Sequence, residues 1–404
     1  MLGVSSAIGY LPGTPEYRRV AVGLFLAGVT TFALLHAPQP LLPEFASFFG
    51  LSAQQAALAV SFSTLGLGLA LLITGPGTEV IGRTPVMFAS MFVASAVGVA
   101  CAFAPSWGWL LVLRFVQGVA LAGLPAVATA YIREEVHPGA TSRAVGLYIG
   151  GTGLGGMSGR LLSGLVADHW GWRAAFAVLG IVCLCVAIAA KVLLPASRNF
   201  VPGVRSARSV WTTAVRALTD PALIALYVIS GLLMGGFVAV YNAMGFRLAA
   251  PPYMLPLSLA SLVFVTYIVG TPASTSAGAM ADRFGQKRVL PLAIGSGLLG
   301  LLITALVPLP LVIIGLAIFT AGFFAAHGVA SGWVAIRATE RGGGAGQAAA
   351  LYLFAYYLGS SVFGAVAGFA WTHWAWPGVV VLVGTLWTIA LVLALALRFV
   401  RRAA

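Results

Sequence analysis

Charged side chains are scarce in this 404-residue chain, at 8% of the residues, and acids are the scarcer sign, with 9 Asp and Glu against 22 Lys and Arg. A soluble domain of this length needs far more charge on the surface that faces water. Sixty per cent of the residues are hydrophobic, and the mean hydropathy is +1.01. The composition therefore excludes an ordinary soluble protein and predicts a chain that crosses a membrane repeatedly.

Several chemical signatures are also missing. The three cysteines, Cys101, Cys183 and Cys185, lie in apolar runs without histidine or carboxylate neighbours, so we expect them to pack and to bind no metal. No G-x-x-x-x-G-K-[ST] phosphate loop is present, which disfavours direct ATP coupling. An intramembrane enzyme would need paired acids, a His–Asp cluster or a serine dyad, and a receptor would normally add a soluble domain. We expect no enzymatic activity and no cofactor.

Apolar runs of the length that a helix needs to cross the hydrocarbon core recur along the chain. They predict an all-α polytopic membrane protein with twelve transmembrane helices, arranged as an N-terminal six-helix bundle (1–195), a cytoplasmic linker (196–220) and a C-terminal six-helix bundle (221–404). The predicted spans are 20–43, 52–74, 85–103, 108–132, 144–167, 173–194, 221–247, 254–279, 289–307, 309–335, 347–371 and 376–399.

The positive charges indicate the orientation. With the N-terminus inside, the tails and the loops after even-numbered spans hold 18 of the 22 Lys and Arg. Arg173 and Arg247 lie in outer loops, and Arg114 and Arg160 lie within spans. This asymmetry predicts that both termini are cytoplasmic. The basic residues follow short linkers and form no basic domain, so we expect no nucleic-acid partner.

The two halves repeat each other at an offset of about 204 residues. The segment "GLGGMSGRLLSGLVADHWGW" (153–172) aligns with "YLGSSVFGAVAGFAWTHWAW" (357–376), and Arg133 falls on Arg337. Repeats of this kind are typical of transporters in which two halves rock about a site near the membrane midplane. His169 and His373 occupy matching outer ends beside tryptophans and are expected to be interfacial anchors.

A charged segment, "GAMADRFGQKR" (278–288), aligns with "GPGTEVIGRTP" (75–85) in the loop after span 2. Its pattern G-x-x-x-D-R-x-G-x-K resembles the cytoplasmic loop signature of the major facilitator superfamily. The first copy departs from it, with Val80 where arginine is usual. We interpret the pair as a conformational latch, with a plain topology anchor as the alternative. The latch residues are Gly75, Glu79, Gly82, Arg83, Gly278, Asp282, Arg283, Gly285 and Lys287.

Two further stretches carry the same resemblance. "RFVQGVALAG" (114–123) resembles the R-x-x-Q-G motif of span 4, and "GLGGMSGRL" (153–161) resembles the span 5 antiporter motif G-P-x-x-G-G, with Gly156 in place of the proline and Arg160 in place of the last glycine. Over essentially its whole length the chain resembles the drug:proton antiporter-like branch of the superfamily, and within it the YnfM-like inner-membrane transport proteins of bacteria. The resemblance implies the major facilitator fold, a place in the bacterial inner membrane and proton-coupled export.

Polar groups within the spans are the candidate site. Arg114 and Arg160 are each expected to act on an anion or in coupling, with snorkelling to headgroups as the alternative for Arg114. No carboxylate lies at mid-membrane, so His36 or His327 is the candidate proton carrier, with a purely structural histidine as the alternative. The cavity candidates are His36, Gln39, Arg114, Gln117, Arg160, Tyr241, Asn242, His327, Tyr352 and Tyr356.

The leading hypothesis is a secondary active transporter that exports a moderately hydrophobic or sugar-like solute by alternating access, coupled to protons. The alternative is an importer or uniporter of a small organic solute, which Arg114 and Arg160 allow to be anionic. The expected partners are a small-molecule substrate, protons and the lipid bilayer, and the protein is expected to be a monomer.

Overall fold

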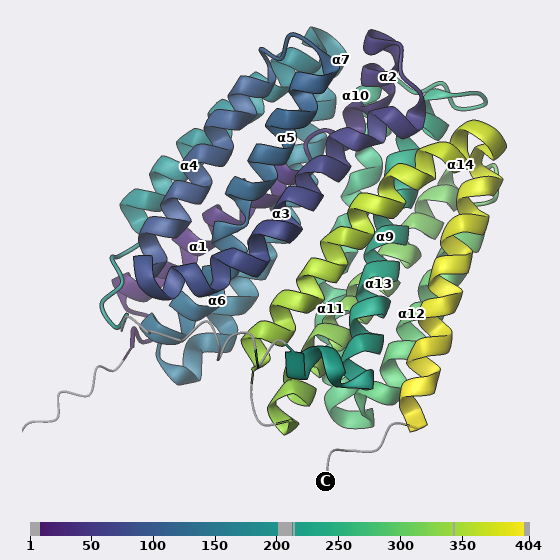
Figure 1. Ribbon diagram of the computed structural model, residues 1–404. Helices are drawn as coiled ribbons and strands as arrows, with labels where there is room; N and C mark the ends of the chain where they lie inside the picture. Colours follow the sequence, from purple (N-terminus) through teal and green to yellow (C-terminus); the bar gives the residue numbers. More distant parts are fainter. Residues whose placement is uncertain (1–8, 201–211, 213–214, 342–343, 400–404) are drawn as a thin grey trace, which may run out of the picture.

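The regular structure is helical throughout the residues that the computed structural model describes, which are 9–200, 212, 215–341 and 344–399, without the side chains of 75–80 (Figure 1). The helices of the first half are α1 (Pro15–His36), η1 (Gln39–Leu41), α2 (Leu42–Phe49), α3 (Ala53–Ile81), α4 (Arg83–Cys101), α5 (Trp107–Leu121), α6 (Gly123–Glu135), η2 (Pro138–Ala140) and α7 (Thr141–Leu193). Those of the second half are α9 (Pro221–Ala249), α10 (Leu257–Ser261), η3 (Leu262–Val269), α11 (Gly270–Phe284), α12 (Gln286–Ile303), α13 (Leu309–Glu340), α14 (Ala345–Ala396) and η4 (Leu397–Phe399).

In the part of the chain that the structure describes, ten helical segments are long and apolar enough to cross a membrane, and two of them are long enough to cross it twice. The helices α7 and α14 have 53 and 52 residues. At a rise of 1.5 Å per residue each would be about 80 Å long, more than twice the hydrocarbon core. Helix α7 breaks at Gly171 (φ 78°), and α14 breaks at Trp374 and Ala375. Counting both arms of these helices gives the twelve crossings expected from the sequence.

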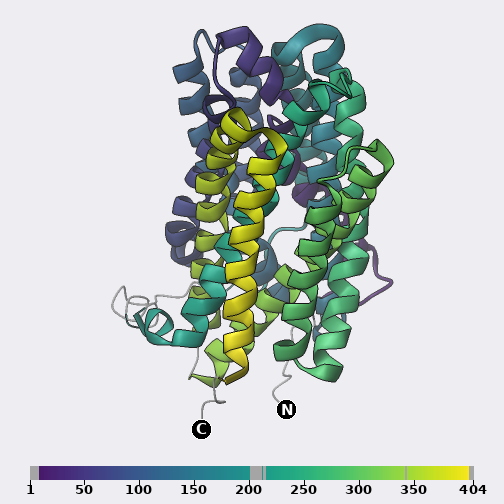
Figure 2. The ribbon, with the colours of Figure 1, turned by 90° about the vertical axis from the view of Figure 1, so that its right-hand side faces the viewer.

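Two helical halves lie side by side, with α3 of the first half along α14 of the second (Figure 1). The start of α1 and the short helix η4 lie at the same end of the molecule (Figure 2), which we call the terminal end. The other end, which holds the breaks at Gly171 and Trp374, we call the distal end. His169 and His373 accordingly lie at the distal end, where each ring nitrogen Nδ1 contacts the carbonyl four residues earlier, as the repeat predicts.

Three predicted spans are interrupted, and in two of them proline supplies the physical reason. Span 1 turns into η1 and α2 at Pro38 and Pro40, which have no N–H to continue the helix. Span 4 divides into α5 and α6, where Pro125 cannot donate to Leu121. Span 8 contains η3, an eight-residue 3₁₀ helix between α10 and α11. A mid-helix 3₁₀ run of this length is uncommon and frequently marks a hinge.

The two matching charged segments, 75–85 and 278–288, each place a glycine at a turn between helices. Gly82 separates α3 from α4 with φ 98°, and Gly285 separates α11 from α12 with φ 86°. Residues that carry a Cβ rarely adopt a positive φ, so glycine is the residue that allows both turns. The matching geometry of the two turns agrees with the internal repeat.

Candidate functional site

A chain of hydrogen bonds crosses from one half to the other through buried side chains. Arg160 of α7 donates from Nε to Gln39 Oε1 at 2.6 Å, and Gln39 Nε2 donates to Asn242 Oδ1 of α9 at 2.8 Å. Asn242 then donates to the Gly364 carbonyl of α14 at 3.2 Å. Three residues proposed from the sequence therefore meet in one place, and they come from elements far apart in the chain.

The proline-rich sequence after α1 prepares this contact. Because Pro38 cannot donate to the Leu34 carbonyl, the end of α1 is left with backbone acceptors, and the chain turns so that Gln39 faces the other half. The Ala37 carbonyl accepts from Ser163 Oγ of α7 at 2.9 Å. The break in the first span thus supplies both a side chain and backbone acceptors to the centre of the molecule.

Arg114 is fully buried inside the first half, where it joins α1, α3 and α5. It has five N–H donors, and all five have acceptors, none of which is a carboxylate. Snorkelling to the headgroups does not describe this geometry. The acceptors are the carbonyls of Ala59 (3.1 Å), Leu34 (3.1 Å) and Leu35 (2.6 Å), Ser63 Oγ (2.7 Å) and Gln117 Oε1. Gln117 in turn donates to the Ala94 carbonyl at 2.8 Å.

Arg160 lies at the boundary between the halves and faces aromatic rings. Its guanidinium carbon is 5.0 Å from the ring centroid of Phe264 and 4.6 Å from that of Tyr267, both on η3. Side chains three apart eclipse one another on a 3₁₀ helix, which puts Phe264 and Tyr267 on one face. The unusual helix type therefore explains why two rings of the second half meet one arginine of the first.

The two histidines have different surroundings. His36 is 4% exposed, and neither ring nitrogen makes a well-formed hydrogen bond among the described residues, although the Phe32 backbone lies close to the ring. His327 Nδ1 lies 3.0 Å from the Tyr352 hydroxyl, and its ring stacks with Phe323 at a centroid distance of 5.9 Å. Tyr356 lies 4.7 Å from the His327 ring. The sequence candidates His327, Tyr352 and Tyr356 thus form one cluster in the second half.

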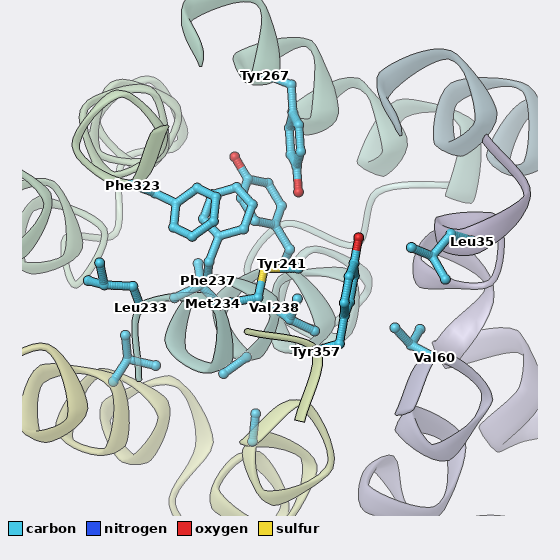
Figure 3. Packing of buried hydrophobic residues seen from close by; sticks show 14 of the residues in the cluster. Leu35, Val60, Leu233, Met234, Phe237, Val238, Tyr241, Tyr267, Phe323 and Tyr357 are labelled. Atoms are coloured by element: carbon cyan, nitrogen blue, oxygen red, sulfur yellow. The ribbon is translucent and has the colours of Figure 1, made fainter. Parts of the chain in front are cut away.

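The rings of Phe237, Phe323 and Tyr267, labelled in Figure 3, lie between this cluster and Arg160, and we call them the aromatic wall. Phe237 and Phe323 stack at 3.9 Å, and the Tyr241 hydroxyl lies between Thr266 (2.7 Å) and Thr320 (2.6 Å). Figure 3 shows the hydroxyl groups of Tyr267 and Tyr357 pointing toward one another, with Leu35 and Val60 of the first half opposite Tyr357. The surface between the halves is therefore apolar and aromatic, with a few hydroxyl groups.

The halves are held together near the distal end. Between described residues, five hydrogen bonds join them, and all five lie in the distal part of the molecule. Ser61 Oγ donates to the Ser361 carbonyl at 2.7 Å, and Ser361 Oγ donates to the Ser61 carbonyl at 2.9 Å. Asp168 accepts from the Ser258 hydroxyl at 2.6 Å and from the Leu257 amide at 3.1 Å.

The separation between α7 and the eighth span increases toward the terminal end. A Cβ added at Gly164 would lie 1.7 Å from Ser261 Oγ, whereas one added at Gly153 would lie 3.9 Å from Thr271 Oγ1. A Cβ added at Gly146 would meet no atom within 4 Å. The three glycines are 11 and 7 residues apart and so share one helix face. The two helices consequently touch at the distal end and diverge from it.

The antiporter-like motif on α7 retains a small-residue seam although its proline is absent. Three glycines four residues apart bring α7 into backbone contact with α1, so that any added Cβ would overlap the neighbouring chain. The pairs are Gly151 with Phe25, Gly155 with Val29 and Gly159 with Ala33. Replacing the last motif glycine with Arg160 leaves this seam intact and adds a charge beside it.

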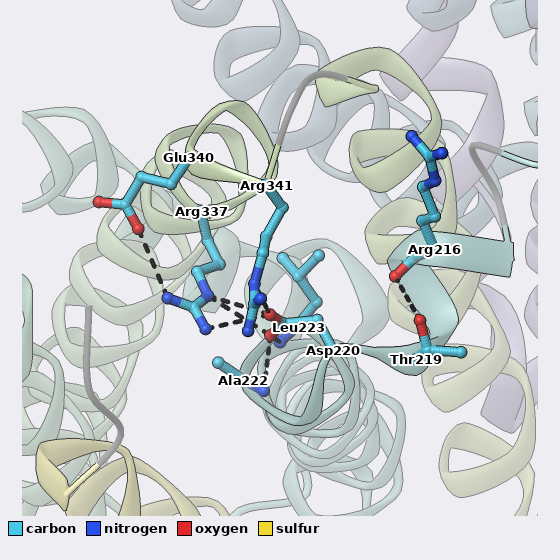
Figure 4. A network of polar contacts seen from close by, with 8 residues as sticks. All are labelled: Arg216, Thr219, Asp220, Ala222, Leu223, Arg337, Glu340 and Arg341. Atoms are coloured by element: carbon cyan, nitrogen blue, oxygen red, sulfur yellow. Dashed lines mark hydrogen bonds and ion pairs between the residues drawn. The ribbon is translucent and has the colours of Figure 1, made fainter. Parts of the chain in front are cut away.

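The ion pairs between described residues at the terminal end lie within single halves. Arg83 pairs with Glu134 at 2.9 Å in the first half. In the second, Asp220 caps α9 and binds Arg337 (3.0 Å) and Arg341 (2.7 Å) (Figure 4). Burial alone would raise the pKa of Asp220, but hydrogen bonds from the Leu223 amide and both arginines hold that pKa below its usual value of 3.8.

Between described residues, no hydrogen bond or ion pair of the predicted latch residues joins the two halves. Asp282 and Arg283 are exposed, and Asp282 has no ion-pair partner among the described residues. Lys287 contacts the Arg398 carbonyl at 3.2 Å. Gly75 and Glu79 belong to α3, but their side chains lie outside the described residues. A role for the latch residues in another conformation stays a prediction.

Several residues of this region were missed from the sequence. Ser61 and Ser361 carry no motif, and Phe264 and Tyr267 look like ordinary apolar residues of span 8. For Asp220 a signal existed, because an aspartate before proline at a helix start is a typical N-cap. At the offset of 204, Asp220 also aligns with Glu16, and its partner Arg337 aligns with Arg133.

Comparison with known proteins adds the evolutionary context. Residues 20–362 match the family model described as Major Facilitator Superfamily. The uncharacterized MFS-type transporter YybF of Bacillus subtilis is 40% identical over 94% of this chain and 93% of its own. The inner membrane transport protein YnfM of Escherichia coli is 39% identical over 94% and 90%.

A solved structure shares the fold. A bacterial homologue of the human lysosomal transporter Spinster, in an inward-facing and occupied conformation, aligns with a TM-score of 0.73 and 14% identity over 95% of this chain and 96% of that one. The twelve-crossing arrangement in two halves is therefore one that transport proteins use.

Proposed function

Because this chain belongs to the major facilitator superfamily and is a multi-pass membrane transporter, we propose that it is a secondary active transporter that exports a small organic molecule in exchange for protons. The solute binds between the halves, against Arg160 and the aromatic wall of Phe237, Phe323 and Tyr267. The terminal end is cytoplasmic, in agreement with the distribution of Lys and Arg. The resident membrane is the bacterial inner membrane.

One observation supports a transport mechanism of alternating access. The five hydrogen bonds between the halves are confined to the distal part, while α7 and the eighth span diverge toward the terminal end. This is the arrangement of a transporter closed on one side and accessible from the other. In the opposite state the bonds of Gln39, Ser61 and Asp168 must break, and contacts at the terminal end must replace them.

The energetics permit such a change. A typical intramolecular hydrogen bond contributes about 0.5–1.5 kcal/mol net. Five of them give a few kcal/mol, which solute binding and new contacts at the terminal end can offset. Contacts of Asp282 and Arg283 are the candidates for that second closure, because both side chains are exposed in the present conformation.

Protons are the proposed coupling ion, and a histidine is the proposed carrier. No Asp or Glu lies at mid-membrane in the sequence, whereas His327 faces the aromatic wall and contacts the Tyr352 hydroxyl. The small-residue seam of α7 supports the resemblance to proton-coupled exporters. Import or uniport of an anionic solute is the second candidate, which the uncompensated charge of Arg160 favours.

The test is flux of solute and protons together. Purified protein is reconstituted into liposomes that contain a pH-sensitive dye, and a panel of radiolabelled small organic solutes is loaded inside. An exporter coupled to protons releases one of these solutes faster when the pH gradient drives protons the other way, and a protonophore abolishes the acceleration. Solute movement that ignores the pH gradient identifies a uniporter and overturns proton coupling.

A further inference from the structure

Arg160 holds a positive charge that no carboxylate of the described chain neutralises. It is 1% exposed, and its two hydrogen bonds, to Gln39 Oε1 and to the Gly156 carbonyl at 2.6 Å, use two of its five N–H donors. An unpaired arginine within a membrane span is costly, and chains that keep one give it a partner or a task. The counter-charge is therefore expected to come from outside the chain.

Arg114 provides an internal comparison. It is equally buried, yet its five donors are all satisfied by the protein, as described above. Its hydrogen-bonding capacity is used up in joining α1, α3 and α5. Of the two arginines within spans, only Arg160 keeps donors for a ligand in the described part of the chain.

Further polar groups lie close to Arg160. Both ring nitrogens of His36 and the hydroxyl of Tyr267 are buried without a well-formed hydrogen bond among the described residues, although the Phe32 backbone lies close to His36 and the Tyr267 hydroxyl lies close to the Arg160 guanidinium. His36 lies within electrostatic range of Arg160, and the Tyr267 ring is 4.6 Å from the guanidinium. Water could satisfy the histidine and the hydroxyl, but it cannot neutralise the arginine. An acceptor that carries negative charge satisfies all three groups.

The surroundings of this polar cluster select the rest of the ligand. The ring of Phe264 lies on one side of the guanidinium, and Tyr267 continues into the aromatic wall that begins with Phe237, at a centroid distance of 5.4 Å. Aromatic residues next to a few convergent polar groups are typical of sites for small organic ligands. A flat apolar body can stack here beside an anionic group on Arg160.

We propose that Arg160, His36 and Tyr267 form a binding site for the carboxylate of an aromatic monocarboxylic acid. This inference rests on the proposed function and names the substrate class for it. A single charge is expected because, of the two arginines within spans, only Arg160 keeps N–H donors for a ligand in the described part of the chain. Since Arg160 belongs to α7 and Tyr267 to η3, such a ligand contacts both halves at once and stabilises the conformation in which they approach.

Binding is tested at equilibrium, without transport. The full-length protein is purified in detergent, and its melting temperature is followed by tryptophan fluorescence with benzoate, its neutral amide benzamide, and acetate. A ligand that binds only the folded protein raises the melting temperature with its concentration. We expect a saturable rise with benzoate and no rise with benzamide or acetate, because one lacks the charge and the other lacks the ring.

Variants assign the effect to Arg160. Arg160→Gln is expected to weaken benzoate binding about thirtyfold or more, as loss of a buried charge partner does. Arg160→Lys keeps the charge without the planar fork and is expected to restore part of the affinity. The matched control is Arg247→Gln, which removes another buried arginine, bound to the carbonyls of Thr304 and Leu306 at the distal end.

The outcomes separate this inference from the proposed function. A missing response to benzoate, an equal response to benzamide, or full binding by Arg160→Gln overturns the anion site. If benzoate binds through Arg160 but no solute crosses a liposome membrane, the site stands and the transport proposal fails. If a neutral solute is transported equally well by wild type and Arg160→Gln, transport stands and the anion site fails.

Discussion

Gln39 and Asn242 form a 2.8 Å hydrogen bond between the two halves of the molecule, 203 residues apart in a chain that repeats at about 204. Each amide has a second buried partner, Arg160 for Gln39 and the Gly364 carbonyl for Asn242. Two amide side chains proposed from the sequence as cavity residues are thus in direct contact at the boundary between the bundles. This contact links the candidate binding site to the closure of the distal end.

Gln39→Leu is expected to open the distal end. The change leaves the Asn242 oxygen and one Arg160 donor unpaired, at about 1–3 kcal/mol each. The closed conformation therefore loses population by about tenfold or more. Spin labels on Gln55→Cys and His373→Cys, both exposed at the distal end, report the change as a longer distance in a Cys185→Ser background.

Ser158→Ala is the control for that measurement. Ser158 lies two residues from Arg160, and its hydroxyl contacts only the Gly155 carbonyl of its own helix. In Ser158→Ala, the distribution of distances between the two spin labels should match that of the labelled protein without this substitution. An unchanged distribution in Gln39→Leu would mean that the serine pair and the Asp168 contacts suffice to keep the distal end closed.

Gly164→Ala is expected to prevent the distal contact between α7 and the eighth span, because the new Cβ would lie 1.7 Å from Ser261 Oγ. Gly146→Ala makes the same chemical change on the same face where no atom lies within 4 Å, so it should be silent. Solute flux in liposomes is the readout. Recovery of flux in Gly164→Ala with Ser261→Gly would tie the defect to this contact.

Arg114→Leu is expected to destabilise the first half. The substitution leaves the carbonyls of Leu34, Leu35 and Ala59 without their arginine partner, at about 1–3 kcal/mol for each buried group. Arg114→Lys should recover only part of the loss, because an ammonium has three donors. The thermal midpoint in detergent measures this. A wild-type midpoint combined with lost proton coupling would restore the coupling role expected from the sequence.

Stability should depend on Asp220 in a defined pH range. The folded-state pKa of Asp220 lies below 3.8, so its stabilising contribution is complete above that pH and is lost as the pH falls through the folded value. Asp220→Asn keeps the helix cap but removes the negative charge that pairs with Arg337 and Arg341. The difference in melting temperature between wild type and Asp220→Asn should be constant from pH 5 to 8 and shrink below about pH 4.

The repeat and the turn glycines could be read from the sequence because they depend on local chemistry. Gly82 and Gly285 are required by backbone conformation, and the interruption of span 1 follows from Pro38 and Pro40. Arg114 and Arg160 could not be told apart at that level, since both are single arginines in apolar runs. What separates them is the number of acceptors that neighbouring helices present, which depends on tertiary packing.

Hydropathy, the length of the apolar runs and backbone chemistry along the chain were enough to predict the membrane fold, its twelve crossings and the internal repeat. The tertiary structure was needed to find that the hydrogen bonds between the halves gather toward the distal end, and that Arg160, His36 and Tyr267 meet with no carboxylate among the described residues. Such contacts join residues more than a hundred positions apart. They depend on how two halves lie against each other, and no local pattern of residues encodes that.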